Sequence, residues 1–281
     1  MPEHPSTTPA LTSESVGDFY DHMGAFFDAL YGENIHFGLW DDDPNPSMPE
    51  AQNRLTNRMI DTLNLQDDEY LLDVGCGTGH PAIRLAQRTR ARVLGVSISP
   101  TQVAKATEKA KTAGLATQLE FIRADAMHLP CEPETFDAAW AIEMLFHVPD
   151  RIQVLREIHR SLKPGGRLVL ADFVQTAHLT DDDWTLLTQG FAFSSLLNTD
   201  TYTDVLTQAG FEAVQIHDVT NQARPNIRWI ESRYTDQRDD LTAHYGPDFT
   251  AQMDELLPTG VSIYTEKLGY VIAEARRPID R

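Results

Sequence analysis

Three glycines placed two residues apart constrain this chain more than any other feature. They occur in LLDVGCGTGHPAIRLA (residues 71–86), where an apolar run precedes them and an amphipathic pattern follows. This order is typical of a buried strand that leads through a tight turn into a helix of an α/β sheet. Glycine permits both the sharp bend and the close approach of a ligand to the backbone. The segment therefore predicts a ligand site at the carboxyl end of a strand.

The residues around the turn restrict the kind of ligand. A P-loop needs Gly-Lys-Ser/Thr after the turn, whereas His80 and Pro81 stand there. The dinucleotide fingerprint G-x-G-x-x-G differs from the G-x-G-x-G spacing of this chain. Asp73, just before the turn, would repel a pyrophosphate but suits a ligand that carries an α-ammonium group. The turn therefore favours a charged nucleoside of another kind.

Strand and helix patterns alternate along the rest of the chain. Beyond the first strand, strands are expected at residues 91–99, 118–125, 136–144, 167–174 and 269–278, and helices at 99–114 and 151–166. Residues 201–220 are expected to form a helix, a Gly-Phe turn and a further strand. Such alternation predicts an α/β fold with a doubly wound, mostly parallel, Rossmann-like sheet. An NAD-dependent oxidoreductase shares this alternation and is the alternative from another functional class.

The organisation expected is one domain at residues 14–281, preceded by a disordered, Pro/Thr/Ser-rich segment at residues 1–13. The domain divides into an N-terminal helical cap (14–66), a cofactor-binding core (67–178), an aromatic-rich insertion for the acceptor (179–200) and the C-terminal part of the sheet (201–281). In the cap, one helix is expected over Val16–Leu30 and a second over Met48–Leu63.

Charge and composition exclude several classes of partner. The balance of 23 basic and 42 acidic residues gives a net charge of −19, which argues against nucleic acid as a partner because phosphate binding depends on Lys and Arg. No apolar run approaches the roughly 20 residues that span a bilayer. The N-terminus lacks the pattern of a signal peptide, and two cysteines are too few for a disulfide framework. These features predict a cytoplasmic protein that acts on a small molecule.

The glycine motif and three later segments together resemble the class I S-adenosylmethionine-dependent methyltransferases. D-x-G-x-G-x-G at residues 73–79 is similar to the first motif of that family, and ADAMHLP, FDAAWAIE and LKPGGRLVLADF follow in the family's order. GENIHFGLW, HVPDR and QARP resemble the rebeccamycin-type sugar O-methyltransferases of secondary metabolism. The resemblance extends over residues 18–278. It implies a Rossmann-like methyltransferase fold, with S-adenosylmethionine as cofactor and S-adenosylhomocysteine as product.

The resemblance also implies a set of cofactor residues. Gly75, Gly77 and Gly79 would contact the methionine part, with Asp73 near its ammonium group. The usual acidic residue that binds the ribose hydroxyls is absent, and Gln102 is the expected substitute. The remaining expected contacts are the adenine residues Asp125 and Ala126, the neighbouring Ser97 and Ile98, the cap residues Tyr20, His36 and Trp40, and Glu143 in either the cofactor or the acceptor site.

The chemistry is expected just past the fourth strand. His147 would accept a proton from an acceptor hydroxyl, oriented by Asp172. Phe146 stands where the relatives have a first histidine, so C-methylation of a prenyl alkene through an aromatic-stabilised cation is the close alternative, and N-methylation of an amine a more distant one. The aromatic residues expected to line an apolar acceptor pocket are Phe146, Phe173, Phe191, Phe193 and Tyr202.

The other histidines lack the spacing of metal ligands, so no metal requirement is expected. The apolar side chains of the first cap helix could pair subunits in a homo-oligomer or pack within the chain. The predicted biological role is methylation of a natural product, as in antibiotic biosynthesis.

Overall fold

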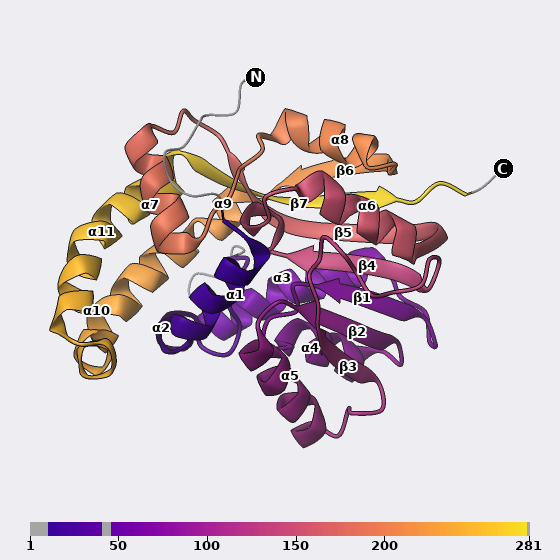
Figure 1. Ribbon diagram of the computed structural model, residues 1–281, viewed down its shortest axis with the longest axis horizontal. Coiled ribbons are helices and arrows are strands. Elements are labelled where there is room, and N and C mark those ends of the chain that lie inside the picture. Colours follow the sequence, from indigo (N-terminus) through magenta and orange to yellow (C-terminus); the bar gives the residue numbers. More distant parts are fainter. Residues whose placement is uncertain (1–10, 41–45, 280–281) are drawn as a thin grey trace.

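The computed structural model describes residues 11–40 and 46–279. It contains one seven-stranded sheet with the strand order β3-β2-β1-β4-β5-β7-β6 (Figure 1). The strands are β1 (Tyr70–Val74), β2 (Arg92–Ser97), β3 (Leu119–Arg123), β4 (Phe136–Ile142), β5 (Leu162–Gln175), β6 (Glu212–Asp218) and β7 (Leu268–Arg276). β7 runs antiparallel to both β5 and β6, and the other pairings are parallel. The predicted mostly parallel, doubly wound sheet is therefore confirmed.

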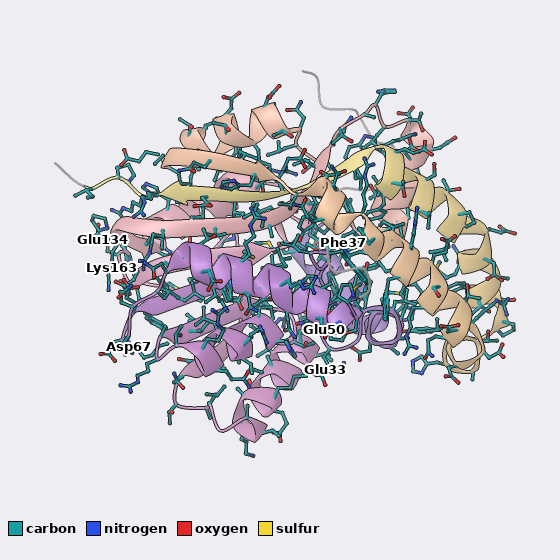
Figure 2. All side chains as sticks on the ribbon, turned by 180° about the vertical axis from the view of Figure 1, so that it is seen from behind. Glu33, Phe37, Glu50, Asp67, Glu134 and Lys163 are labelled. Carbon is teal, nitrogen blue, oxygen red and sulfur yellow. The ribbon has the colours of Figure 1, made fainter. Side chains whose placement is uncertain are left out.

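Helices cover both faces of this sheet. One face packs against α3 (Met48–Leu63), α4 (His80–Arg88) and α5 (Pro100–Thr112), and the other against α6 (Arg151–Ser161) and α8 (Thr199–Gln208). In Figure 2, which shows the molecule from behind, α3 lies over this face of the sheet. Successive side chains of β1 point to opposite faces of the sheet, since Leu71 belongs to one buried cluster and Leu72 to the other.

Local sequence signals set several helix ends. Ser47 and Glu50 form a capping box at the start of α3, with the Ser47 N–H donating to Glu50 Oε2 at 2.7 Å. Ser99 caps α5 by accepting a hydrogen bond from the Gln102 N–H at 3.0 Å, and Pro100 is the first helical residue. The helix expected over residues 151–166 ends earlier, at Ser161, because Leu162 already pairs with Phe136 in the sheet.

The first cap helix differs from the expectation. Two helices replace the single helix over Val16–Leu30, namely α1 (Ser13–His22) and α2 (Gly24–Tyr31), and they are separated at Met23. Most of the segment expected to be disordered, residues 1–13, lies outside the described residues, but Ser13 is the first residue of α1. The helix therefore begins before the expected cap boundary at residue 14.

A helical pair extends from the sheet and covers the cap. It consists of α10 (Pro225–Tyr245) and α11 (Pro247–Glu266), which follow the short α9 (Thr220–Ala223) and lie side by side in Figure 1. Phe26, Phe27 and Leu30 of α2 are buried against this pair together with Tyr234 and Leu241. The apolar cap side chains that could have paired subunits are thus packed within the same chain.

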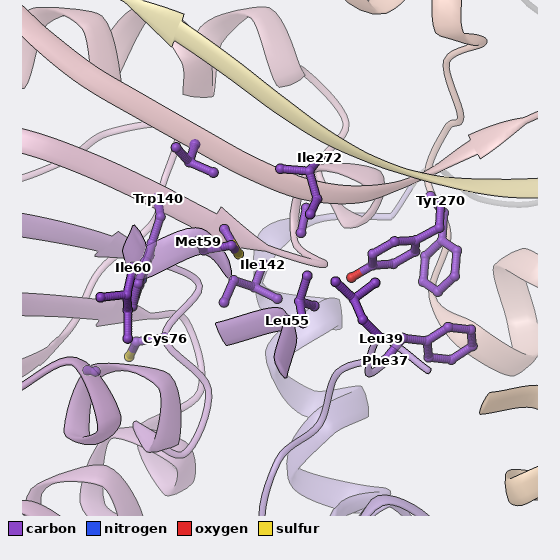
Figure 3. Close-up of a cluster of buried hydrophobic side chains, with 14 of the residues drawn as sticks. Phe37, Leu39, Leu55, Met59, Ile60, Cys76, Trp140, Ile142, Tyr270 and Ile272 are labelled. Carbon is purple, nitrogen blue, oxygen red and sulfur yellow. The ribbon is translucent and has the colours of Figure 1, made fainter. Parts of the chain in front are cut away.

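The core cluster between α3 and the sheet leads directly to the site. It runs from Trp140 and Cys76 at one end to Phe37 and Tyr270 at the other (Figure 3). Phe37 precedes α3 and stacks on Tyr270 of β7, with ring centroids 6.0 Å apart and an interplanar angle of 15°. This stack fixes the loop before α3 against the carboxyl end of β4, where the functional residues gather.

Candidate functional site

A cavity lies at the carboxyl ends of the parallel strands, where ligands bind in open α/β sheets. It encloses about 730 Å³ of space between protein atoms, part of it open to solvent. Its wall comes from the glycine turn, the segments that follow β2, β3 and β4, and α1. The described lining residues are Ser13, Val16, Tyr20, Ile35, Gly75, Gly77, Val96, Ser97, Ile98, Gln102, Ala124, Asp125, Ala126, Ile142, Glu143, Met144, His147 and Val148.

The three glycines of the turn have different roles. Gly75, Gly77 and Gly79 have φ values of 78°, 52° and 79°, in the region that favours glycine. Gly75 and Gly77 line the cavity. A Cβ on Gly77 would meet no atom within 4 Å, whereas one on Gly79 would lie 2.8 Å from the Ala106 Cβ. Gly79 therefore allows the close packing of the turn against α5. Contrary to the expectation, Gly79 is not among the described residues of the cavity wall.

Asp73 lies beneath the turn and is not among the described lining residues. Its side chain is 2% exposed, and within the described residues its Oδ2 has no hydrogen-bond partner. Burial raises the pKa of this carboxyl to about 7, with the Trp140 indole acting in the opposite direction. The structure thus places Asp73 near the turn without bringing it to the cavity surface.

One end of the cavity carries all five residues expected to hold the nucleoside. These are Ser97 and Ile98 after β2, Gln102 in α5, and Asp125 and Ala126 after β3. Ser97 Oγ donates to Gln102 Oε1 at 2.8 Å, which fixes the Gln102 amide beside the strand end. The Asp125 Oδ1 atom accepts a hydrogen bond from the Met127 N–H at 2.9 Å. This end therefore presents a carboxylate, an amide and backbone groups to a ligand.

His147 lies at the other end of the cavity, in a short 3₁₀ turn at Leu145–His147. Its Nδ1 lies 2.9 Å from the carbonyl oxygen of Ala192, which can only accept, so Nδ1 carries the proton. Nε2 is then an acceptor and takes a hydrogen bond from the Tyr20 hydroxyl at 2.7 Å. Burial lowers the pKa of His147 to about 4, so the imidazole is neutral at pH 7.

Asp172 does not orient His147, contrary to the expectation. Its Oδ1 accepts from the Phe173 N–H at 2.9 Å and its Oδ2 from the Tyr202 hydroxyl at 3.1 Å. Asp172 is 2% exposed, and burial raises its pKa to about 7 despite nearby Arg151. Tyr202 is 1% exposed and packs behind the sheet, so it is not an acceptor contact either. β5 directs Asp172 away from the cavity toward α8, where the Tyr202 hydroxyl binds it, so both residues belong to the interior.

Glu143 follows β4 and faces the cavity in an unusual conformation. Its φ is +50°, which is costly for a residue with a side chain and is often found at functional sites. Its Oε1 accepts from the Phe37 N–H at 2.6 Å and from the Tyr270 hydroxyl at 2.7 Å. Burial raises its pKa to about 8, so the carboxyl is protonated at neutral pH. Glu143 thereby links the cap, β4 and β7 at the cavity wall.

The aromatic residues expected to contact an acceptor pack against one another. Phe146 stacks on Phe193 with centroids 4.2 Å apart, and Phe173 meets Phe146 edge to face at 5.4 Å. Phe191 contacts Tyr264 of α11 edge to face at 5.6 Å. None of the four phenylalanines is among the described lining residues. The insertion, whose helix is α7 (Asp181–Phe191), thus contributes aromatic side chains to the core.

Two cap residues expected at the cofactor lie elsewhere. His36 is 3% exposed, its Nδ1 donates to the Phe37 carbonyl at 2.6 Å, and it packs beside Thr56 of α3. Trp40 packs against Trp229 of α10, with centroids 6.0 Å apart. Neither residue is among the described lining residues, because the segment before α3 directs both toward helices. Of the three cap residues expected, only Tyr20 reaches the cavity.

Seven lining residues were not anticipated from the sequence: Ser13, Val16, Ile35, Val96, Ala124, Ile142 and Val148. Ser13 and Val16 lie seven and four residues before Tyr20, on the same stripe of α1. Helical spacing from Tyr20 could have identified both, had the helix been expected to begin at Ser13.

Residues 11–40 and 46–279 contain no group of three or more His, Cys, Asp or Glu side chains placed to hold a metal ion. Within the same ranges, no helix is both long and apolar enough to cross a membrane. Cys76 and Cys131 are free thiols.

Known proteins resemble the chain in sequence and in fold. The family described as "Methyltransferase domain" matches residues 72–170. A 27-O-demethylrifamycin SV methyltransferase of Amycolatopsis mediterranei is 37% identical over 271 residues, covering 95% of this chain and 98% of that protein. A (+)-O-methylkolavelool synthase of Herpetosiphon aurantiacus is 33% identical and covers 96% of each chain. The crystal structure of the (4+2)-cyclase SpnF has a TM-score of 0.86 and 31% identity, covering 97% of this chain and 99% of that one.

Proposed function

The chain belongs to the S-adenosylmethionine-dependent methyltransferases, and we propose that it methylates a hydroxyl group of a bulky, largely apolar small molecule of secondary metabolism. The observation that carries this proposal is the neutral His147, whose Nε2 already accepts a hydrogen bond from a hydroxyl group at the cavity wall. The names of the relatives from A. mediterranei and H. aurantiacus refer to an O-demethyl and an O-methyl compound, which supports the same acceptor group.

The cavity residues fit S-adenosylmethionine. Gly77 offers space that a Cβ would fill, which suits the methionine part, and Asp125 with Gln102 offers polar atoms for the nucleoside. Asp73 lies buried beneath the turn, and its Oδ2 has no hydrogen-bond partner among the described residues. When bound, the cofactor supplies a methyl group activated by a sulfonium. No step proposed for this chain requires a metal ion, and the free cysteines suit a cytoplasmic setting.

His147 supplies the base in this proposal. The acceptor hydroxyl replaces the Tyr20 hydroxyl at Nε2, and Nε2 takes its proton as the oxygen–methyl bond forms. The hydrogen bond from Nδ1 to the Ala192 carbonyl holds the ring and disperses the positive charge that develops on it. α1 covers the His147 end of the cavity, where it would hold the acceptor in line with the methyl group and keep water away from both.

The charges around the cavity favour a neutral acceptor. Among the described lining residues there is no lysine or arginine, and the two ionisable carboxyl groups are Asp125 and Glu143. A phosphorylated acceptor would need cationic partners to offset its charge. We therefore propose a free alcohol or phenol as the acceptor class, with no phosphate group attached.

The alternative of C-methylation on a prenyl alkene has less support. It depends on aromatic faces turned toward a developing cation, but Phe146, Phe173 and Phe193 pack against one another and are not among the described lining residues. His147 has no partner among the described acidic side chains, so the arrangement favours proton removal from a hydroxyl by a neutral imidazole.

A labelling experiment tests the proposed function. Methyl-labelled S-adenosylmethionine is incubated with neutral hydroxylated polyketides and terpenoids, with phosphorylated counterparts, and with amines, followed by mass spectrometry. Label should appear on a hydroxyl oxygen, and His147→Asn should lower turnover about 10²- to 10⁴-fold. His178→Asn, at an exposed histidine, is the matched control and should keep wild-type turnover.

Other results of this experiment would contradict the proposal. Label on carbon or nitrogen would exclude hydroxyl methylation. Tight binding of S-adenosylhomocysteine without transfer to any acceptor class would indicate that the chain binds the cofactor without methylating an acceptor. Unchanged turnover in the His147→Asn enzyme would remove His147 as the base.

A further inference from the structure

One face of α1 forms a wall of the cavity. Ser13, Val16 and Tyr20 line the cavity and are spaced by three and four residues, which places them along a single stripe of the helix. Tyr20 was expected on this wall, whereas Ser13 and Val16 were not. The stripe extends over two turns, so its two ends face different parts of the cavity.

Contacts made by neighbouring residues of α1 fix its direction. Glu14 Oε1 lies 3.9 Å from Arg123 Nη2, at the end of β3, and a Cβ on Gly17 would lie 3.4 Å from Ile98 Cγ2. At the other end of the helix, the Tyr20 hydroxyl bonds to His147. The first turn of α1 therefore lies over the nucleoside end of the cavity, and its last turn lies over the reaction end.

The Ser13 hydroxyl differs from the other hydroxyls of this turn. Thr12 Oγ1 accepts from the Ser15 N–H at 3.1 Å, and Ser15 Oγ accepts from the Thr12 N–H at 2.9 Å, so both are engaged in the capping box. Ser13 Oγ is buried and has no hydrogen-bond partner in the part of the chain that the structure describes. A buried hydroxyl without a partner is unfavourable, so a partner is expected to be supplied by what binds in the cavity.

We propose that Ser13 is a cofactor-binding residue whose Oγ hydrogen-bonds to the adenosine part of S-adenosylmethionine. This inference rests on the proposed function, which supplies the ligand. Adenine ring nitrogens and ribose hydroxyls both present polar atoms that a serine hydroxyl can bond. Binding of the nucleoside therefore gives α1 the hydrogen bond that Ser13 lacks, and holds α1 closed over the cavity.

Titration calorimetry with the full chain tests the proposal. Ser13→Ala should weaken S-adenosylhomocysteine binding about 3- to 10-fold, as expected for loss of one hydrogen bond. 5′-Methylthioadenosine, which keeps the nucleoside and lacks the amino acid part, should lose the same factor. Without ligand, Ser13→Ala should melt at or above the wild-type temperature, because the substitution removes an unsatisfied hydroxyl.

Ser161→Ala is the matched control. Its Oγ is also buried without a partner among the described residues. Ser161, however, ends α6 just before the amino-terminal end of β5, whereas the cavity lies at the carboxyl ends of the parallel strands. This variant should bind both ligands as wild type does. Hydrogen exchange provides a second readout, since S-adenosylhomocysteine should slow exchange across residues 13–22 less in Ser13→Ala than in wild type.

The outcomes separate this inference from the proposed function. Equal affinity of Ser13→Ala and wild type for both ligands would overturn the inference and leave the methyltransferase proposal intact. A loss for S-adenosylhomocysteine alone would place the contact on the amino acid part and also overturn it. If wild type binds neither ligand, the proposed function itself fails.

Discussion

Gly77 and Gly79 stand two residues apart in the same turn and face different surroundings. Gly77→Ala places a methyl group in the cavity, so we expect more than tenfold weaker S-adenosylhomocysteine binding with about 1 kcal/mol lost from the free energy of unfolding. Gly79→Ala pushes a methyl group against Ala106 and Phe121, which adds overpacking of about 1–3 kcal/mol. The affinity of the Gly79→Ala variant for S-adenosylhomocysteine should stay within a few-fold of wild type. Calorimetry and denaturant unfolding check both variants, and unchanged affinity in Gly77→Ala would contradict the assignment.

Residues close to the glycine motif could be predicted, and residues that depend on distant partners could not. Ser97, Gln102 and Asp125 follow strand ends whose positions the motif order sets, and all reach the cavity. The partner of His147 is a main-chain carbonyl 45 residues away, at Ala192, where the chain bends after α7. No side-chain pattern encodes such a carbonyl, so the sequence pointed to Asp172 instead.

At the scale of elements, α1 is a separate helix of the cap that hydrogen bonds hold against the core. Met23, with φ −87° and ψ 6°, separates α1 from α2, and α2 is buried beneath α10 and α11. The α1 helix is attached to the core through the Tyr20–His147 hydrogen bond and through a short hydrogen bond from Ser99 Oγ to Asp21 Oδ1. Opening α1 about Met23 would break these two hydrogen bonds and also the ring contacts of Phe19 and Tyr20 with Phe27 of α2, whose centroids lie 5.8 and 5.3 Å apart.

Removing the Asp21 contact tests this arrangement. Asp21→Ala should make α1 easier to open by about 1 kcal/mol, which is roughly a fivefold faster amide exchange over residues 13–22. Asp18→Ala, at an exposed acidic residue of the same helix, is the control and should exchange as wild type does. Equal exchange in the two variants would show that Asp21 does not hold α1 closed.

The insertion after β5 shows why an aromatic pattern can mislead. Its phenylalanines could equally have lined a pocket or packed on the sheet, since both environments are apolar. The choice was decided by α11, whose Tyr264 packs against Phe173, Phe191 and Phe193. Because α11 lies some 70 residues farther along the chain, local patterns around the insertion could not reveal this packing.

At the scale of the whole molecule, three buried carboxyl groups make stability depend on pH. Burial raises the pKa of Asp73 and Asp172 to about 7 and that of Glu143 to about 8. In the unfolded chain these groups ionise near pH 4. The folded protein therefore holds more protons between pH 4 and pH 8, and stability falls as pH rises through this range.

Thermal unfolding between pH 6.5 and pH 9 checks this sign. Burial lowers the pKa of His36 and His147 to about 4, so both are neutral in the folded protein. In the unfolded chain they lose their protons around pH 6.5, and this opposing effect is largely complete by about pH 7.5. The melting temperature should fall from pH 6.5 to pH 8.5 and then level off. Glu143→Gln keeps an acceptor oxygen and should flatten the part of the curve near pH 8. A flat wild-type profile would contradict the raised pKa values.

The sheet as a whole could be predicted because strand and helix patterns alternate along most of the core, in an order that begins with the glycine motif. The position of β7 between β5 and β6 is set by long-range pairing, such as Leu170 with Ala273, and no local residue announces it.

One helix touches both the adenosine end and the His147 end of a single cavity, and this has a kinetic consequence. We expect spent cofactor and methylated product to leave through the same movement of α1, which would couple the release of one to the release of the other. The frequency of that movement sets an upper limit on turnover, and thickening the solvent with glycerol should slow the enzyme even when the methyl transfer itself is fast.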